Sequence, residues 1–425
     1  LRNTYPTGLT ATDWTRIAPG VARLVALRAT ENELLERHAA TWVPSFPDES
    51  GAQWGGFRRG FPERVTLQAA VDLASVAPHL RANPPVTIEL YDFAPELVER
   101  LAGAGLLGCV AGIDAVSIPG LRAFVSRPEA RGLRTLETRE PGEVVSLLTE
   151  GPNWTGLHTF ELSRAPLGTE DAETLFRATN LPALRRLWVR GSGWSADTIR
   201  TLSEGRPTNL TLLRLSYCNL DDDAAEALAA CPALANLREL DLAHNRIGGR
   251  GATALLCSPH LTKLAHLNLD HNSCTGLDAE LLATAEPASL RLLHFHGARM
   301  RTADVRALSR CPRLRTLWYL DIDQNNLRTA AVREMVRGFK RWAPPILWLA
   351  YNQLDDRAAE LLAGWKGAAN LSALHIKHNH RMTGAGTRAL LDSPHLANLT
   401  ALGVSTVDPD DVERFKKRFP HPDNY

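Results

Sequence analysis

At 425 residues the chain is long enough for two or three domains, and its composition, 44% hydrophobic and 22% charged, is that of an ordinary globular protein. The net charge of +1 offers no overall attraction to nucleic acid or to an anionic membrane, so we expect neither as a partner. No stretch approaches the roughly 18 consecutive apolar residues that a membrane-spanning helix needs. None has the basic, then apolar, then small-residue order of a secretory signal peptide.

The first 156 residues lack a regular pattern. Residues 1–84 are expected to form an N-terminal helical and capping region, with a helix over "TENELLERHAATWV" at 30–43. Residues 85–156 are expected to hold irregular, degenerate repeats, because "PPVTIELYDF" and "GCVAGIDAVSIPGL" have the outline of worn strand-and-turn units.

From residue 157 to 408 the chain repeats the outline L-x-x-L-x-L-x-x-N/C-x-L every 26 to 28 residues. A constant period of this size is typical of a solenoid, in which each repeat packs only against its neighbours. The repeats start at Leu157, Leu184, Leu210, Leu237, Leu264, Leu290, Leu317, Pro344, Leu371 and Leu399.

Each part of the repeat has a physical reason. The alternating L-x-L, such as Leu240 and Leu242, predicts a short strand with one buried face. The N position predicts a ladder of buried side chains that bond to the backbone of the turn, since buried backbone groups without partners are costly. This structural ladder comprises Cys218, Asn245, Asn272, Asn325, Asn352 and Asn379.

The second half of each repeat predicts a helix. The stretch "DDDAAEALAACPAL" has aspartates in its first turn, an apolar stripe and a proline that ends it. At the end of the chain, residues 409–425 predict a capping helix, whose Phe415 and Phe419 cover the last repeat.

The repeat outline resembles the leucine-rich repeat family, and strand–turn–helix units of this length resemble its ribonuclease-inhibitor-like subclass. The resemblance implies an α/β fold: a right-handed, curved solenoid, or horseshoe, with parallel strands on the concave face and helices on the convex face. Residues 20–70, with "HAATW" followed by "FRRGFPERV", resemble the segment that joins a repeat-companion domain to leucine-rich repeats in bacterial proteins of the planctomycete type. The companion domain's own Y-A-D-W-L-E-E-like stretch is absent, so that domain is expected upstream of Leu1 or has diverged.

The strand positions that point away from the leucine core form columns across the repeats, because adjacent strands lie about 4.8 Å apart. Two zones stand out: a basic aromatic zone near Arg186–Arg214 and an acidic zone rich in histidine near Glu239–Asp323. Aromatic, charged and histidine side chains of this kind are well suited to contact with a protein partner. We expect a protein partner to bind there; the alternative is a solvated polar face without a partner. The candidate partner-binding residues are Trp188, Arg190, Arg214, Tyr217, Glu239, Asp241, His266, Asn268, Asp270, His294, His296, Tyr319, Asp321, Asp323, Trp348, Tyr351 and His375.

A metal site is a second interpretation of the acidic zone. Asp270, His296 and Asp323 offer one imidazole and two carboxylates, which are common ligands of zinc and similar metals. A catalytic His–Asp pair, with His294 or His296 as the base, is the enzymatic alternative. We expect the carboxylates to raise the pKa values of these histidines, so that binding would change between about pH 6 and 8.

The sequence carries no phosphate-binding loop, HExxH metalloprotease motif or serine-hydrolase elbow. We therefore expect a non-enzymatic interaction scaffold with no catalytic residue and no cofactor, and with a protein as its partner. A regulator of the GTPase-activating type is an alternative by fold analogy alone. The six cysteines form no C-x-x-C pair, which favours reduced thiols and, with the resemblance, a monomeric bacterial protein of the cytoplasm.

Overall fold

The computed structural model describes residues 46–47, 49–54, 57–58, 61–62, 64–68, 70–82, 87–90, 94–113, 117–138, 141–151, 154–162, 166–204, 209–285 and 289–419. The helix expected at 30–43 lies outside these residues. The chain divides into two compact units. The N-terminal unit holds the described residues up to Cys218 together with Cys231–Leu237, and the C-terminal unit holds Asn219–Ala230 and the described residues from Arg238 onward.

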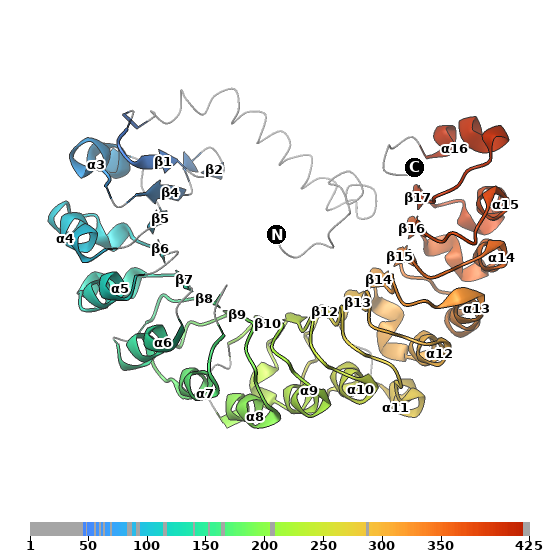
Figure 1. Cartoon of the computed structure of the whole chain (residues 1–425), viewed down its shortest axis with the longest axis horizontal. Helices are drawn as coiled ribbons and strands as arrows, with labels where there is room; N and C mark the ends of the chain where they lie inside the picture. The colour runs from blue at the N-terminus through green and yellow to red at the C-terminus, as the bar shows by residue number, and fades with distance from the viewer. Residues whose placement is uncertain are drawn as a thin grey trace. The chain divides into compact units, whose positions relative to one another are not determined.

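The described part of the N-terminal unit begins with four short strands, and from β4 onward strands and helices alternate (Figure 1). Its strands are β1 (Ala52–Trp54), β2 (Phe57–Arg58), β3 (Phe61–Pro62), β4 (Arg64–Leu67), β5 (Thr87–Leu90), β6 (Gly112–Ile113), β7 (Thr135–Thr138), β8 (Thr159–Leu162), β9 (Arg186–Arg190) and β10 (Leu212–Ser216). Its helices are α3 (Leu73–Ala82), α4 (Pro95–Gly103), α5 (Ile118–Val125), α6 (Pro141–Glu150), α7 (Thr169–Arg177) and α8 (Ala196–Glu204), with 3₁₀ turns η1 (Leu107–Cys109), η2 (Pro128–Gly132) and η3 (Pro232–Leu234). Strand β1 pairs antiparallel with β4, β2 pairs with β3, and β4 to β10 pair in parallel in chain order.

The C-terminal unit has the same alternation. Its strands are β11 (Glu239–Asp241), β12 (His266–Asn268), β13 (Leu292–His294), β14 (Tyr319–Asp321), β15 (Ile346–Trp348), β16 (Ala373–His375) and β17 (Ala401–Gly403), all parallel in chain order. Its helices are α9 (Asp222–Ala229), α10 (Gly249–Cys257), α11 (Ala279–Thr284), α12 (Thr302–Arg310), α13 (Arg328–Phe339), α14 (Asp356–Ala363), α15 (Gly384–Asp392) and α16 (Val412–Arg418). The 3₁₀ turns are η4 (Pro312–Thr316), η5 (Lys366–Asn370), η6 (Pro394–Leu396) and η7 (Pro409–Asp411).

The predicted α/β solenoid is confirmed. Strands β8 to β17 each begin two residues after a predicted repeat start, as Glu239 follows Leu237 and Tyr319 follows Leu317. Parallel pairing already begins at β4, well before the first regular repeat. The predicted segment boundaries after residues 84, 156 and 408 stay predictions.

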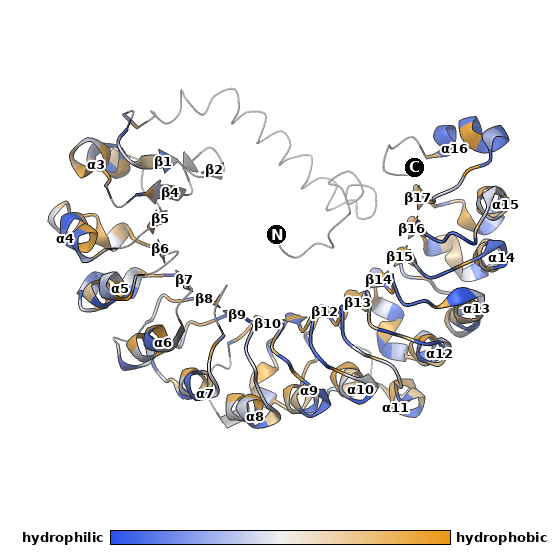
Figure 2. Cartoon of the chain, viewed as in Figure 1, coloured by the Kyte–Doolittle hydropathy of each residue, from blue (hydrophilic) through white to orange (hydrophobic). Residues whose placement is uncertain are grey.

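The leucines of the repeat form the core between the strands and the helices. Leu267 and Leu269 have 0% exposure, and Leu374 and Ile376 have 1%. Full burial of one such side chain stabilises the fold by about 1.5–3 kcal/mol, so every repeat contributes in the same way. The helices carry both hydrophobic and hydrophilic residues, as elements between a core and solvent must (Figure 2).

The helical half of the repeat begins and ends as predicted. Asp221 caps α9 by accepting a hydrogen bond from the backbone N–H of Ala224 at 3.0 Å, and Ala225 and Leu228 are buried. Pro232 follows the helix as the first residue of η3. Helices in the part of the chain that the structure describes are too short or too polar to cross a membrane.

The predicted capping helix forms as α16. Phe415 and Phe419 are fully buried, as the cover of a terminal repeat should be. Arg418 donates hydrogen bonds to the carbonyl oxygens of Leu391 and Leu396. These two bonds of Arg418 connect the cap to the preceding repeat.

The asparagines of the ladder join each repeat to the one before it. The Oδ1 of Asn272 accepts from the backbone N–H of Ile247 at 3.0 Å, and its Nδ2 donates to the carbonyls of Leu242 at 2.9 Å and Leu269 at 3.1 Å. Asn325, Asn352 and Asn379 bond in the same manner, and Asn245 accepts from the N–H of Leu220. At Cys218 the thiol lies 3.6 Å from the carbonyl oxygen of Val189.

We expect Asn272→Ala to lower the free energy of unfolding by roughly 1–3 kcal/mol, because it leaves buried backbone groups of two repeats without partners. Urea denaturation followed by circular dichroism measures the loss. Asn370→Ala is the matched control, since Asn370 is exposed. Equal stability of the two variants would contradict a structural role for the ladder.

Candidate functional site

The strand face is the sheet surface opposite the helices and the leucine core, and the strand register confirms its predicted columns. Places are counted from the first residue of each repeat, so that Leu237 is the first place and Glu239 the third. The residues at the third place of successive C-terminal repeats lie side by side, as do those at the fifth place. The third-place column is Glu239, His266, Leu292, Tyr319, Ile346, Ala373 and Ala401. The fifth-place column is Asp241, Asn268, His294, Asp321, Trp348, His375 and Gly403.

The basic aromatic zone lies in the N-terminal unit and consists of two cation–π pairs. The guanidinium carbon of Arg214 lies 4.9 Å from the ring centre of Trp188, its register neighbour. The guanidinium carbon of Arg190 lies 4.7 Å from the ring centre of Tyr217. Arg214 is buried, whereas Arg190 and Tyr217 are exposed. These pairs hold two planar cations at defined places on the strand face.

A row of rings marks the turn that follows the strands. Tyr217, His244, His271, Tyr351 and His378 have φ between 52° and 60°, in the left-handed region that few residues other than glycine adopt. The rings of neighbouring repeats stack: the centroids of His244 and His271 are 4.3 Å apart, and those of Tyr351 and His378 are 4.2 Å apart. The left-handed turn thus sets aromatic side chains at the edge of the strand face, where Tyr351 is 48% exposed.

An apolar stripe lies on the strand face of the C-terminal unit. Tyr319, Ile346 and Ala373 form a buried cluster, and Leu292, Trp348 and Ala401 pack against it. The ring centroids of Tyr319 and Trp348 are 5.5 Å apart. The third-place column is therefore apolar and buried at Tyr319, Ile346 and Ala373, and not polar along its whole length.

An acidic cluster lies beside the stripe and comprises Asp270, Asp321 and Asp323 with the histidines His294 and His296. His294, Asp321 and Asp323 are only 6%, 5% and 4% exposed. The Tyr319 hydroxyl donates to Asp321 Oδ2 at 3.1 Å, and the Asp323 N–H donates to Asp321 Oδ1 at 2.9 Å. Sequence reasoning placed these side chains correctly on the face but treated them as exposed contact residues.

Backbone N–H groups also hold the other two carboxylates. Asp323 accepts from the N–H of Ala350 at 2.6 Å, and Asp270 accepts from the N–H of His296 at 2.7 Å. The three carboxylates are therefore fixed by the same strand stacking that sets the columns.

Burial controls the protonation of this cluster. Loss of water, with added repulsion from Asp321, raises the pKa of Asp270 to about 8. Burial together with repulsion from Asp323 raises the pKa of Asp321 to about 7, and burial alone raises the pKa of Asp323 to about 7. The three carboxylates destabilise one another once they are charged.

The prediction that neighbouring carboxylates raise the histidine pKa values is wrong for His294. Burial, with repulsion from His266 and His296, lowers the pKa of His294 well below its usual value. Burial also lowers the pKa of His375 to about 4. Removal of water from an imidazolium outweighs the attraction of nearby carboxylates, which are themselves partly protonated near neutral pH.

The structure changes the membership of the predicted metal trio. The ligand atoms that lie within 4.8 Å of one another belong to His296, Asp321 and Asp323. Asp270, which the sequence favoured in place of Asp321, instead accepts the backbone N–H of His296. His375 adds a feature that sequence reasoning missed, because its Nδ1 lies 3.7 Å from Asp323 Oδ2. The two residues belong to repeats that are separated by one intervening repeat, whose Ala350 N–H donates to Asp323.

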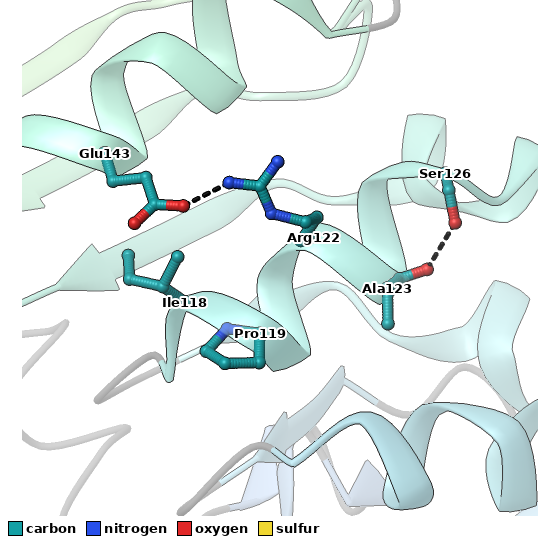
Figure 3. A pocket seen from close by; sticks show the side chains of 6 residues that line it. All are labelled: Ile118, Pro119, Arg122, Ala123, Ser126 and Glu143. Atoms are coloured by element: carbon teal, nitrogen blue, oxygen red, sulfur yellow. Dashed lines mark hydrogen bonds and ion pairs between the residues drawn. The ribbon is translucent and has the colours of Figure 1, made fainter.

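A separate hollow lies on the helix side of the N-terminal unit, between α5 and α6 (Figure 3). It is lined by Ile118, Pro119, Arg122, Ala123, Ser126 and Glu143. Arg122 and Glu143 form an ion pair across it, and both side chains are at least half exposed. Paired and solvated charges leave little free energy for a ligand, so this hollow is not a candidate site.

Replacing one buried carboxylate should stabilise the metal-free protein. A carboxyl group whose pKa is raised on folding contributes stability below its unfolded pKa and loses it as pH rises through its folded pKa. Above about pH 8 the repulsion is therefore present, and we expect Asp321→Asn to raise the free energy of unfolding by roughly 1–2 kcal/mol in chelator.

Denaturant titration of the wild type, Asp321→Asn and the exposed control Asp410→Asn measures this effect. A folded Asp321→Asn variant that is less stable than the wild type at alkaline pH would refute the electrostatic interpretation of the cluster.

Comparisons with known proteins agree with the repeat architecture. A family model described as "Leucine Rich repeat" matches residues 206–229 and 233–256. No curated protein matches the sequence. An internalin (InlF) from Listeria monocytogenes is 18% identical over 81% of this chain and 86% of its own, with a TM-score of 0.49.

A structure of the Rad7 and Elc1 complex in yeast is 13% identical over 83% of this chain and 82% of its own, with a TM-score of 0.50. At this identity the likeness concerns the fold alone. The matched repeats and the shared fold together support a leucine-rich repeat protein.

Proposed function

We propose that this protein is a non-enzymatic scaffold that captures a protein partner on its strand face. The observation that carries the proposal is the set of large aromatic side chains left accessible there, with Tyr217 44% and Tyr351 48% exposed and Trp188 and Trp348 half buried. Tyrosine and tryptophan contribute strongly to protein interfaces because they bury much area at little cost in side-chain entropy. Repeated strands add such contacts one after another.

The two zones favour different chemistry in the partner. In the N-terminal unit, Arg190 and Arg214 with their aromatic neighbours suit an acidic segment. In the C-terminal unit, Trp348 packs against the apolar stripe and lies beside Asp321 in register, which suits apolar and basic side chains. The near-complete burial of Asp321 and Asp323 leaves little room for a substrate, which favours binding over catalysis.

The proposal also includes the repeat subclass, the bacterial origin and the cellular location of the protein. The repeat period of 26 to 28 residues, with an α-helix in the second half of most repeats, supports the ribonuclease-inhibitor-like subclass. The N-terminal resemblance to bacterial proteins of the planctomycete type supports a bacterial origin, and the scattered cysteines support the cytoplasm as its location.

Affinity capture with matched variants tests the proposal. We expect Tyr351→Asn to lose at least tenfold of the captured partner, about 1.4 kcal/mol, because an exposed aromatic anchor is removed. Asparagine tolerates the positive φ of 53° at this position, so the turn is retained.

The control is Leu281→Ala, which removes a 54% exposed side chain from α11 on the helix side. Partners retained by the wild type and by Leu281→Ala but lost from Tyr351→Asn support the strand face. Identical captured proteins from all three would contradict it.

A further inference from the structure

We infer that His296, Asp321 and Asp323 form a binding site for one divalent transition-metal ion, with zinc as the ion that fits the donors. This site is additional to partner capture and does not depend on it. Its three ligand atoms lie within 4.8 Å of one another. In a tetrahedral zinc site such atoms are about 3.3–3.5 Å apart, since each bond is about 2.0–2.2 Å long. The three side chains would therefore have to move closer together by about 1 Å on binding the ion.

The cluster holds more carboxyl groups than positively charged partners. Asp270, Asp321 and Asp323 bring three carboxylates to one buried region of the strand face. Within the part of the chain that the structure describes, no lysine or arginine forms an ion pair with any of them. The Nδ1 of His375 lies 3.7 Å from Asp323 Oδ2, but burial lowers the pKa of this histidine to about 4, so its ring is uncharged near neutral pH. Buried carboxylates are stabilised by a counter-charge or a metal, and a divalent ion would stabilise their deprotonated form and displace their protons.

Two buried imidazole nitrogens, in residues next to the cluster, lack a hydrogen-bond partner. His294 is 6% exposed and pairs in register with Asp321, and its Nε2 has no hydrogen-bond partner in the described structure. The Nδ1 of His375 is also buried without a hydrogen bond and lies 3.7 Å from Asp323 Oδ2. Such groups are rare in folded proteins and call for an ion or an ordered water. A metal bound by the three side chains would keep a fourth coordination position for water.

The donors and their burial select the class of ligand. One imidazole with carboxylates suits zinc and similar ions, whereas calcium requires six to eight oxygen ligands and magnesium retains several waters. A lysine or arginine side chain from a partner could also neutralise the carboxylates, but Asp321 and Asp323 are too deeply buried for a long side chain to reach. The ion is therefore favoured over the partner side chain.

Calorimetry of tag-free, chelator-treated protein with zinc chloride tests the site. We expect the wild type to bind one zinc ion and Asp323→Asn to bind it at least tenfold more weakly. Asp241→Asn is the matched control, because Asp241 lies in the fifth-place column of the same face but outside the three ligands. Cobalt substitution should give visible absorption bands typical of a four-coordinate site in the wild type and not in Asp323→Asn.

Circular dichroism and denaturation in chelator show that each variant is folded, so that lost binding is not lost structure. A folded wild type without saturable zinc binding, or an Asp323→Asn variant that binds as tightly as Asp241→Asn, would overturn the inference. Equal binding of calcium or magnesium would overturn the choice of metal class. Tyr351→Asn should bind zinc normally, so failure of partner capture and failure of the metal site are separate outcomes.

Discussion

The stacking of one repeat on the next through buried leucines is the constraint on which the rest of the structure depends. Leu240, Leu267, Leu293, Leu320 and Leu347 occupy the same place in successive repeats and are at most 2% exposed. Because each repeat buries its apolar side only against its neighbours, the register between strands is fixed wherever the leucines recur. The asparagine ladder adds a polar tie of the same period, since each amide bonds to the backbone of the preceding repeat.

That register places residues about 27 positions apart in the sequence beside one another. His296 and Asp323 are separated by one repeat, yet their ligand atoms lie within 4.8 Å. The cost is electrostatic, because carboxylates that are held together and kept from water destabilise the fold. A bound ligand that favours the charged carboxylates would offset this cost, which is why the cluster is central to the metal-site proposal.

Much of this arrangement could be predicted from the sequence, because a fixed period and an L-x-L alternation determine both the strand starts and the columns. The position of Tyr319 beside Ile346, and of His294 beside Asp321, follows from counting alone. Counting does not give burial, since it contains no information on how side chains of neighbouring columns lean over one another. The sequence therefore favoured exposed, readily protonated histidines, whereas His294 is buried.

Contacts between strands that are not direct neighbours, and contacts on the helix side, also could not be predicted from the sequence. The approach of His375 to Asp323 crosses two strands. On the helix side, Asp222 accepts hydrogen bonds from the N–H groups of Gly248 at 2.6 Å and Gly251 at 2.9 Å, and Asp356 accepts from those of Thr383 at 2.7 Å and Gly386 at 3.0 Å. These bonds between aspartates and the backbone N–H groups of the next repeat form a second ladder, on the helix side. The glycines within 248–251 and 384–386 indicate it only once the packing of the helices is known.

Cysteine crosslinking across the edge of the strand face tests the stacking most directly. Cysteines in place of Tyr351 and His378, whose stacked rings lie 4.2 Å apart in adjacent repeats, should form a disulfide under mild oxidation. Cysteines in place of Tyr351 and Thr406, which lie two repeats apart, should not, because two strand spacings of about 4.8 Å exceed the reach of a disulfide. Efficient crosslinking of the second pair, or failure of the first in folded protein, would contradict the stacking on which both proposals depend.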